Sequence, residues 1–180
     1  MPAAVEPREF RQTVGQFVTG VTVLAMEVDG EIRTMTANSF TSVSLDPPLV
    51  LVCVGKGTRM GQFVESARGF SINILRLDQQ HLSAYFAGLW REPEPPPFQF
   101  LAWDGGPRLD GAAAALGCDR HAIYDGGDHW IVIGLVVALH RPTGPYRPLA
   151  FFRGRYVAVE ESDRPFDDGA MMISWSEPIG

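Results

Sequence analysis

The sequence predicts a mainly β protein, an antiparallel β-barrel of Greek-key-like type with a few short flanking helices. Glycine (19 residues) and proline (14 residues) are frequent, and both favour turns over long helices. Roughly eight segments have strand character and three have helical character. Most of the strand-like segments follow one another across turns, as in antiparallel barrels and sandwiches. Closure into a barrel also suits a strand as apolar on both faces as 129–139, because it leaves no unpaired edge.

The composition is that of one globular domain. Hydrophobic residues make up 46% of the 180 residues and charged residues 20%, which is too apolar for a disordered chain. The net charge of −6 argues against nucleic-acid binding. The first ten residues lack an apolar stretch, and the longest apolar run, 130–139, is far below the roughly 20 residues that span a bilayer. We therefore expect a cytoplasmic protein without nucleic-acid or membrane partners.

The first expected elements are a short helix and a hairpin. Within residues 6–18, apolar side chains recur at helical spacing, which predicts an amphipathic helix: Phe10, Val14, Phe17 and Val18. Two runs of β-branched and apolar residues, 21–28 and 31–37, then flank Asp29-Gly30. Asp-Gly between two such runs is a strong signal for a β-hairpin.

The next part of the chain predicts two more strands and a second helix. Residues 40–45 are expected to be extended, and 49–54 has the uniform apolar character of a fully buried strand. Thr58 can cap a short helix that runs to about Ala67, with Gly69 closing it.

The remaining elements follow the same logic. Asp78 can cap a third helix that stops at Gly88, and the proline-rich stretch 92–97 can form neither helix nor sheet. The turn 125–128 separates two of the later strands. Strands are expected over 70–75, 116–124, 129–139 and 149–159.

Several common sites are not supported. Gly55-Lys56-Gly57-Thr58 is not a Walker phosphate loop, because Gly57 separates the lysine from the threonine and the upstream glycine is missing. No glycine-rich dinucleotide fingerprint follows a strand and opens a helix. The four histidines are too widely spaced for a metal-ligand pair, so no metal is expected. Cys53 and Cys118 lie in apolar runs and are expected to be core thiols in a reducing compartment.

Two polar segments remain as candidates for ligand binding. Residues 36–44 are rich in small side chains, hydroxyls and amides, which suits a flat heteroaromatic ring such as isoalloxazine. A polar turn followed by a strand with a solvated face is the alternative. Residues 56–59 combine two cations and a hydroxyl at a predicted helix start, which suits a phosphate; a capped surface helix is the alternative. Together the two segments fit a flavin nucleotide.

The same residues resemble a known family. Residues 35–50, with the sequence MTANSFTSVSLDPPLV, resemble the signature segment of the flavin reductase-like family. Further matches follow in the family's order over residues 8–160: FVTGVTV at 17–23, FSINIL at 70–75, LSAYFA at 82–87, GDH at 127–129 and FRGRY at 152–156. The resemblance implies an FMN-binding split barrel over residues 1–160. Residues 161–180 have no counterpart in the family, and we expect them to be an extension that packs on its own or the partner subunit; a loosely ordered end is the alternative. This expectation rests on the apolar side chains of the segment: Phe166, Met171, Met172, Ile173 and Trp175.

The resemblance also implies an activity. Members of the family are NAD(P)H:flavin oxidoreductases, and many are reductase components of two-component flavin-dependent monooxygenases. We therefore expect hydride transfer from NADH or NADPH to FAD or FMN, a homodimer, and a monooxygenase that receives the reduced flavin. The chemistry resides in the cofactors, so no catalytic acid–base pair is required.

Roles on the flavin side are implied position by position. The residues implied to border the isoalloxazine ring are Thr36, Ala37, Asn38 and Ser39, with Ser42 and Val43 nearby. Those implied to line the ring or the ribityl chain are Cys53 and Val54. Those implied to hold the phosphate are Lys56, Thr58 and Arg59.

Further roles are implied on the nicotinamide and adenine sides. Ser83 and Phe86 would contact the ribityl-phosphate side or the adenine of a dinucleotide. His129 would face the nicotinamide and is the candidate catalytic residue, as a hydrogen-bond donor or a source of positive charge. Arg155 and Tyr156 would close that region.

The sequence leaves three questions open. The family commonly has a second hydroxyl in the phosphate loop where this chain has Met60, which leaves the choice between FAD and FMN undecided. Two other functions stay as alternatives: a split barrel that carries or senses flavin or haem without turnover, and a barrel that binds a metal through its histidines. The absence of an arginine cluster for a 2′-phosphate favours NADH over NADPH.

Overall fold

The computed structural model describes residues 5–160, so the predicted extension 161–180 lies outside the described residues. The helices are α1 (Pro7–Val14) and α2 (Gln80–Phe86), and the 3₁₀ turns are η1 (Met60–Gln62) and η2 (Leu77–Gln79). The strands are β1 (Thr19–Gly20), β2 (Thr22–Val28), β3 (Glu31–Ala37), β4 (Thr41–Leu45), β5 (Pro48–Gly55), β6 (Gly69–Ile74), β7 (Phe100–Leu101), β8 (Arg108–Leu109), β9 (Ala114–Gly126), β10 (His129–His140), β11 (Leu149–Phe152) and β12 (Arg155–Ala158).

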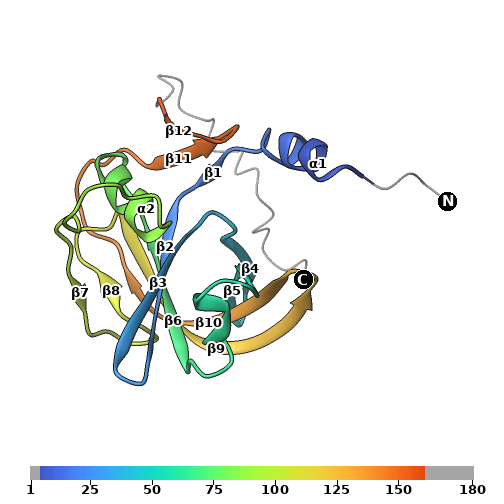
Figure 1. Ribbon diagram of the computed structural model, residues 1–180. Helices are drawn as coiled ribbons and strands as arrows, with labels where there is room; N and C mark the ends of the chain where they lie inside the picture. The colour runs from blue at the N-terminus through green and yellow to red at the C-terminus, as the bar shows by residue number, and fades with distance from the viewer. Residues whose placement is uncertain (1–4, 161–180) are drawn as a thin grey trace, which may run out of the picture.

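Seven strands form one antiparallel sheet in the order β3-β2-β6-β9-β10-β5-β4. The sheet curls, and β3 comes close to β5 across the barrel (Figure 1). A three-stranded sheet, β1-β11-β12, lies beside α1 at the top of the view in Figure 1, and β7 pairs with β8. The prediction of a mainly β, antiparallel split-barrel fold with few short helices is confirmed.

Two clusters of apolar side chains hold the barrel together. The larger lies inside the curled sheet and includes Leu24, Val52, Val54, Phe70, Ile72 and Cys118. The smaller lies between the sheet, α2 and β11, and includes Val21, Leu75, Leu82, Leu109 and Leu149. Packing is close at Gly134, where a Cβ atom would lie 2.6 Å from the ring of Phe70. Such close-packed interiors fix the relative positions of the strands that carry the site.

The hairpin prediction at Asp29-Gly30 is confirmed. Both residues have positive φ (54° and 76°), as a type I′ turn requires, and β2 pairs with β3 up to Val28 opposite Glu31. Both cysteines are free thiols. Burial raises the pKa of Cys118 to about 12 and also raises that of the half-buried Cys53, so both stay protonated as packing residues do.

The first predicted helix is shorter than expected, and its apolar side does not pack on the barrel. It ends at Val14, and none of its residues is buried. Its apolar side chains point to solvent, while Gly15 and Gln16 face the β11–β12 turn: the amide of Arg153 donates to the carbonyl of Gly15 (3.0 Å), and its Nε donates to Oε1 of Gln16 (2.8 Å).

The predicted helix from Thr58 to Ala67 is wrong. Only the short turn η1 forms there, and Gly69 begins strand β6 instead of closing a helix. The expected cap exists, because the hydroxyl of Thr58 accepts the amide of Gly61 (3.1 Å). However, Gly61 packs so closely on Gly55 that a Cβ would overlap the carbonyl oxygen of Gly55. Tertiary contact therefore overrides the local helical preference.

Three further expectations need correction. Asp78 does not cap α2; it accepts two bonds from the guanidinium of Arg76, and η2 precedes the helix. The strand expected over 149–159 is a hairpin, because a turn at Arg153-Gly154 separates β11 from β12. Strand β5 is not uniformly buried: its burial alternates, with Val50, Val52 and Val54 inside.

Candidate functional site

A cleft of about 630 Å³ lies between β3, the segment after β5 and the end of α2. Its size falls within the range of about 300–1,000 Å³ that is usual for ligand pockets. It is lined by Thr34, Met35, Thr36, Thr58, Arg59, Met60, Tyr85, Phe86, Ala87 and Gly88. Four of the residues singled out by sequence thus line one cleft: Thr36, Thr58, Arg59 and Phe86. They supply two hydroxyls, a cation and an aromatic face, which fits a planar, phosphate-bearing ligand such as a flavin nucleotide.

A short series of hydrogen bonds lies behind the wall of the cleft. The hydroxyl of Thr36 donates to the carbonyl of Ser83 (2.7 Å), and the hydroxyl of Ser83 pairs with that of Tyr156 (2.8 Å). Ser83 is fully buried. Its carbonyl binds β3 and its hydroxyl binds β12, so this residue of α2 links the three elements. Because no part of Ser83 is exposed, the structure offers no surface at this residue for the predicted ligand contact.

The loop after β5 is shaped by Thr58. Its hydroxyl donates to the carbonyl of Gly55 (2.7 Å) and accepts the amide of Gly61. This leaves Arg59 at the cleft, and within residues 5–160 its guanidinium has no carboxylate partner. An unpaired guanidinium beside a hydroxyl is a suitable partner for phosphate oxygens.

The segment after β3 is tied to its neighbours by side chains. Ser39 is bound to the backbone of Cys53 in both directions, donating to its carbonyl (3.1 Å) and accepting its amide (2.9 Å). The amide of Asn38 donates to the hydroxyl of Thr19 (3.2 Å). These contacts fix the path of the backbone, whose peptide groups can then face a ring.

The other predicted ring contacts differ in exposure. Ser42 and Val43 are exposed on the edge strand β4. Ala37 is buried and Val54 is fully buried, which leaves Val54 no exposed surface for contact with a ligand. Arg155 is exposed on β12, next to Tyr156.

The predicted site residues other than Thr36, Thr58, Arg59 and Phe86 lie outside the cleft lining. Two of them, Lys56 and His129, lie near the turn between β9 and β10. His129 stands opposite Gly55 in the pairing of β10 with β5, and its Nδ1 lies 2.7 Å from Oδ1 of Asp128. This hydrogen bond lowers the pKa of Asp128. The Nζ of Lys56 lies 2.5 Å from Oδ2 of Asp125, and this hydrogen bond lowers the pKa of Asp125. Lys56, the first residue of the segment 56–59 (the phosphate loop of the sequence prediction), thus lies near His129 at this turn.

The sequence did not single out every residue that lines the cleft. Met35 and Tyr85 line it as well; they lie within the motifs 35–50 and 82–87 but were given no role, and Gly88 was expected only as a helix stop. Asp125 was expected only as a turn residue; its contact with Lys56 joins positions 69 apart in the chain. No local pattern indicates such a pair.

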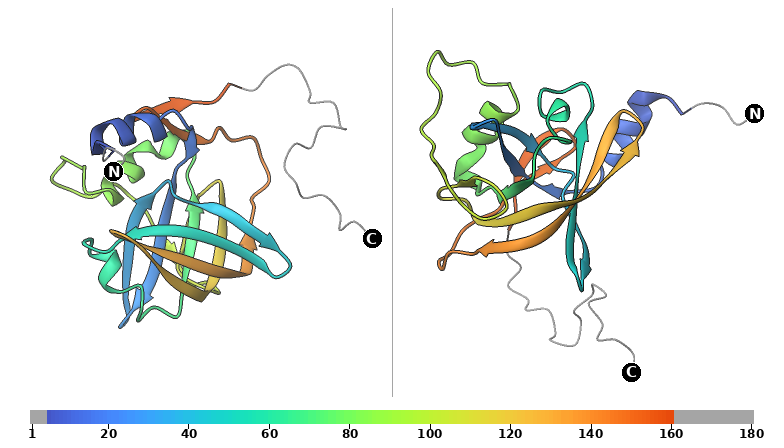
Figure 2. Two further views of the ribbon diagram at one scale, coloured as in Figure 1. Left: turned by 90° about the vertical axis from the view of Figure 1, so that its right-hand side faces the viewer. Right: turned by 90° about the horizontal axis from the view of Figure 1, so that it is seen from below.

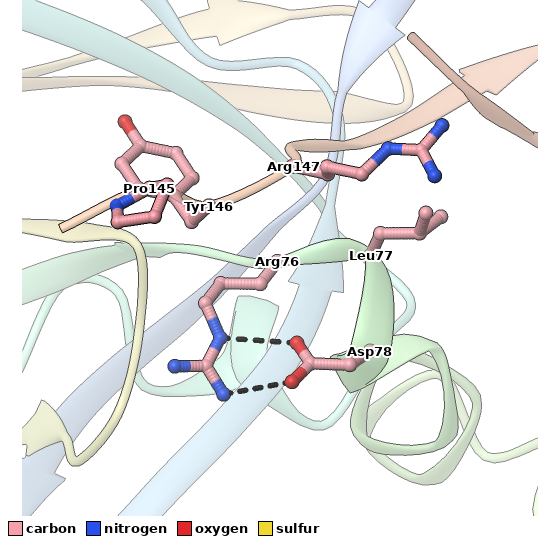
Figure 3. A pocket seen from close by; sticks show the side chains of 6 residues that line it. All are labelled: Arg76, Leu77, Asp78, Pro145, Tyr146 and Arg147. Carbon is pink, nitrogen blue, oxygen red and sulfur yellow. Dashed lines mark hydrogen bonds and ion pairs between the residues drawn. The ribbon is translucent and has the colours of Figure 1, made fainter.

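A second cleft, of about 410 Å³, lies elsewhere on the molecule (Figure 3). Its wall includes the Arg76–Asp78 ion pair and the side chains of Tyr146 and Arg147. It contains none of the residues singled out by sequence, so it carries no part of the candidate site.

Two other features bear on function. Within residues 5–160, no group of three or more histidine, cysteine or acidic side chains is arranged to hold a metal ion. In the same part of the chain, no helix has the length and apolar character needed to cross a bilayer.

Comparison with known proteins gives consistent results. Residues 14–160 match the family described as "Flavin reductase like domain". The reductase subunit HsaB of a flavin-dependent monooxygenase from Mycobacterium tuberculosis is 38% identical over 165 residues, covering 89% of this chain and 86% of that protein. The flavin reductase PheA2 is similar in structure, with a TM-score of 0.81 and 37% identity over 87% of this chain and 100% of that one.

A structure with bound ligand fragments is also similar. The NADH:FAD oxidoreductase SgcE6 from Streptomyces globisporus C-1027, in complex with NAD and FAD fragments, has a TM-score of 0.74 and 36% identity. The alignment covers 93% of this chain and 99% of that one.

Proposed function

Since the chain belongs to the flavin reductase-like family, we propose that it is an NAD(P)H:flavin oxidoreductase that supplies reduced flavin to a partner monooxygenase. The observation that carries the proposal is the cleft in which Thr36, Thr58, Arg59 and Phe86 meet. FAD and NADH are the preferred pair, because a similar enzyme is an NADH:FAD oxidoreductase.

The residues of the chain have binding and positioning roles in this reaction. The flavin supplies the hydride-accepting chemistry, and the protein orients the two rings. Thr58 and Arg59 would hold the phosphate, while the peptide groups of residues 36–39 would bind the ring edge. Tight positioning of two reactants is by itself a large source of rate acceleration.

The first prediction separates an enzyme from a carrier. Flavin added to the protein without oxygen should be bleached by NADH, because the nicotinamide can lie on the bound ring. The measurement is flavin absorbance over time under anaerobic conditions, for FAD and FMN with NADH and NADPH. A protein that binds yellow flavin and leaves it oxidised with both nicotinamides would be a carrier or sensor, and the proposal would fail.

The second prediction concerns His129. His129→Ala should slow hydride transfer about tenfold or more, because loss of one positioned hydrogen-bonding group typically has this effect. Flavin affinity should change much less, because His129 does not line the cleft. Stopped-flow measurement of flavin reduction checks the rate, with His121→Ala on the exposed side of β9 as control. An unchanged rate would refute the role.

We also propose that the protein is a homodimer. α1 and the segment that follows it present apolar side chains to solvent, with Phe10 of α1 58% exposed and Phe17 77% exposed. On the edge strand β4 and on β10, Leu45 and Leu139 are 62% and 74% exposed. Figure 2 shows the β4–β5 hairpin extending away from the barrel. Exposed apolar groups of this extent are typical of interaction surfaces.

The third prediction tests this interface. Phe10→Asp combined with Phe17→Asp should raise the dimer dissociation constant about tenfold or more, because burying unpaired charge is costly. Sedimentation velocity over a range of protein concentrations measures the constant. Because neither side chain is buried in the subunit, the fold should be retained, which circular dichroism can verify. A monomeric wild-type protein would overturn the proposal.

Residues 161–180 are proposed to pack on the cleft of about 890 Å³ beside α1, in their own or the partner subunit. Arg8, Arg11 and Arg153 line this cleft with a single acidic residue, Glu6. The segment 161–180 carries five acidic residues and one basic residue, so the charges are complementary.

The fourth prediction follows from this complementarity. Arg8→Glu with Arg11→Glu should speed hydrogen exchange in residues 161–180, and Asp167→Lys with Asp168→Lys should restore protection in the combined variant. Exchange measured by mass spectrometry reports both. If neither pair of substitutions changed the rate of hydrogen exchange in residues 161–180, this cleft would be ruled out as their binding site.

A cytoplasmic location is also proposed. Two unpaired thiols, Cys53 and Cys118, are compatible with a reducing compartment.

A further inference from the structure

Lys56 is the only lysine in the chain, which has 14 arginines. Its ammonium is already occupied on two sides. Nζ lies 2.5 Å from Oδ2 of Asp125 and 4.5 Å from the ring centroid of Trp130, both near the β9–β10 turn. Lys56 does not line the cleft that contains Thr58 and Arg59. Its position therefore differs from that expected of a phosphate ligand.

The ion pair joins β5 to the β9–β10 turn. Oδ1 of Asp125 accepts the amide of Gly127 (3.0 Å), so one carboxylate oxygen shapes the turn while the other binds Lys56. The amide of Lys56 in turn donates to the carbonyl of Asp128 (3.0 Å). Both the side chain and the backbone of Lys56 thus fix where this turn lies.

His129 is the next residue after the turn. Its Nδ1 faces Asp128, and its Nε2 lies on the side of Gly55, close to where a Cβ at Gly55 would be (3.7 Å). The methyl of Thr58 is near the same point (3.1 Å). The ring of His129 is therefore placed next to the phosphate loop only while the turn keeps its position.

From this geometry we propose that Lys56 and Asp125 are positioning residues for His129, and that Arg59 alone supplies the cation for the phosphate. The proposal rests on the role of His129 in hydride transfer. The ion pair acts by holding the β9–β10 turn against the end of β5. It does so without much effect on stability, because exposed ion pairs contribute little to it.

The alternative role for Lys56, as a phosphate ligand, makes the opposite prediction for one variant. In that case Asp125 would compete with the phosphate for the ammonium, and Asp125→Asn would tighten FMN binding. If the pair positions His129, Asp125→Asn slows hydride transfer and leaves FMN affinity unchanged. A tighter or an unchanged FMN affinity in Asp125→Asn therefore distinguishes the two roles.

The fifth prediction is a kinetic comparison of variants. Lys56→Met and Asp125→Asn should each slow hydride transfer at saturating flavin about three- to tenfold, and the double variant should be no slower than either, because both remove one interaction. Lys56→Arg should restore most of the rate, since a guanidinium can pair with Asp125 and stack on Trp130. Asp78→Asn, which breaks an exposed ion pair away from the turn, is the matched control.

Binding measurements complete the test. Affinities for FMN and riboflavin, which differ by the phosphate, should be unchanged in Lys56→Met, whereas Arg59→Gln should weaken FMN relative to riboflavin. Weaker FMN binding in Lys56→Met together with tighter binding in Asp125→Asn would overturn the proposal. So would an unchanged hydride-transfer rate in both variants.

A readout independent of activity uses the single lysine. Reductive ¹³C-methylation of the full chain gives one side-chain lysine NMR signal. Asp125→Asn should shift this signal and also the ring signals of His129, whereas inorganic phosphate should leave the lysine signal unchanged. The positioning role would be refuted if the chemical shift of the lysine signal changed on addition of phosphate. It would also be refuted if the ring signals of His129 were the same in Asp125→Asn and in the wild-type protein. A failure to reduce flavin would instead refute the proposed function.

Discussion

The pairing of β5 with β10 is the constraint on which the site depends. The register runs without interruption from His129 opposite Gly55 to Leu135 opposite Leu49. Because side chains alternate along a strand, a slip of one residue would exchange the inner and outer faces of β5. Val52 and Val54 are fully buried in the barrel core, so such a slip would expose them. Core packing thus determines which residue stands beside the phosphate loop.

Much of the fold could be predicted because its signals are local. The Asp29-Gly30 turn requires positive φ, and two adjacent residues are enough to specify it. The helix expected after Thr58 fails for a non-local reason, since Gly61 packs against the backbone of Gly55. The outward apolar side of α1 shows the same limit: spacing reveals that a helix is amphipathic, but the direction in which its apolar side faces depends on contacts distant in sequence.

The candidate site was predictable as a set of residue types and only partly as an arrangement. Thr36, Thr58 and Arg59 do line one cleft. Ser83 has the predicted proximity but is fully buried, and its hydroxyl is used by Tyr156. A hydroxyl can bind a ligand or form a hydrogen bond within the protein, and the sequence does not distinguish these two uses. Only the burial of each hydroxyl decides between them.

The two cations of the phosphate loop carry the same charge, but the fold gives them different neighbours. Lys56 and Arg59 are three residues apart, and either could balance a phosphate. The end of β9 brings the carboxylate of Asp125 to Lys56, and no described carboxylate reaches Arg59. A cation that is already paired gains less from a phosphate, because it must first leave its carboxylate. The unpaired guanidinium therefore has the larger driving force for anion binding, and the paired ammonium is free to act as a structural link between two strands.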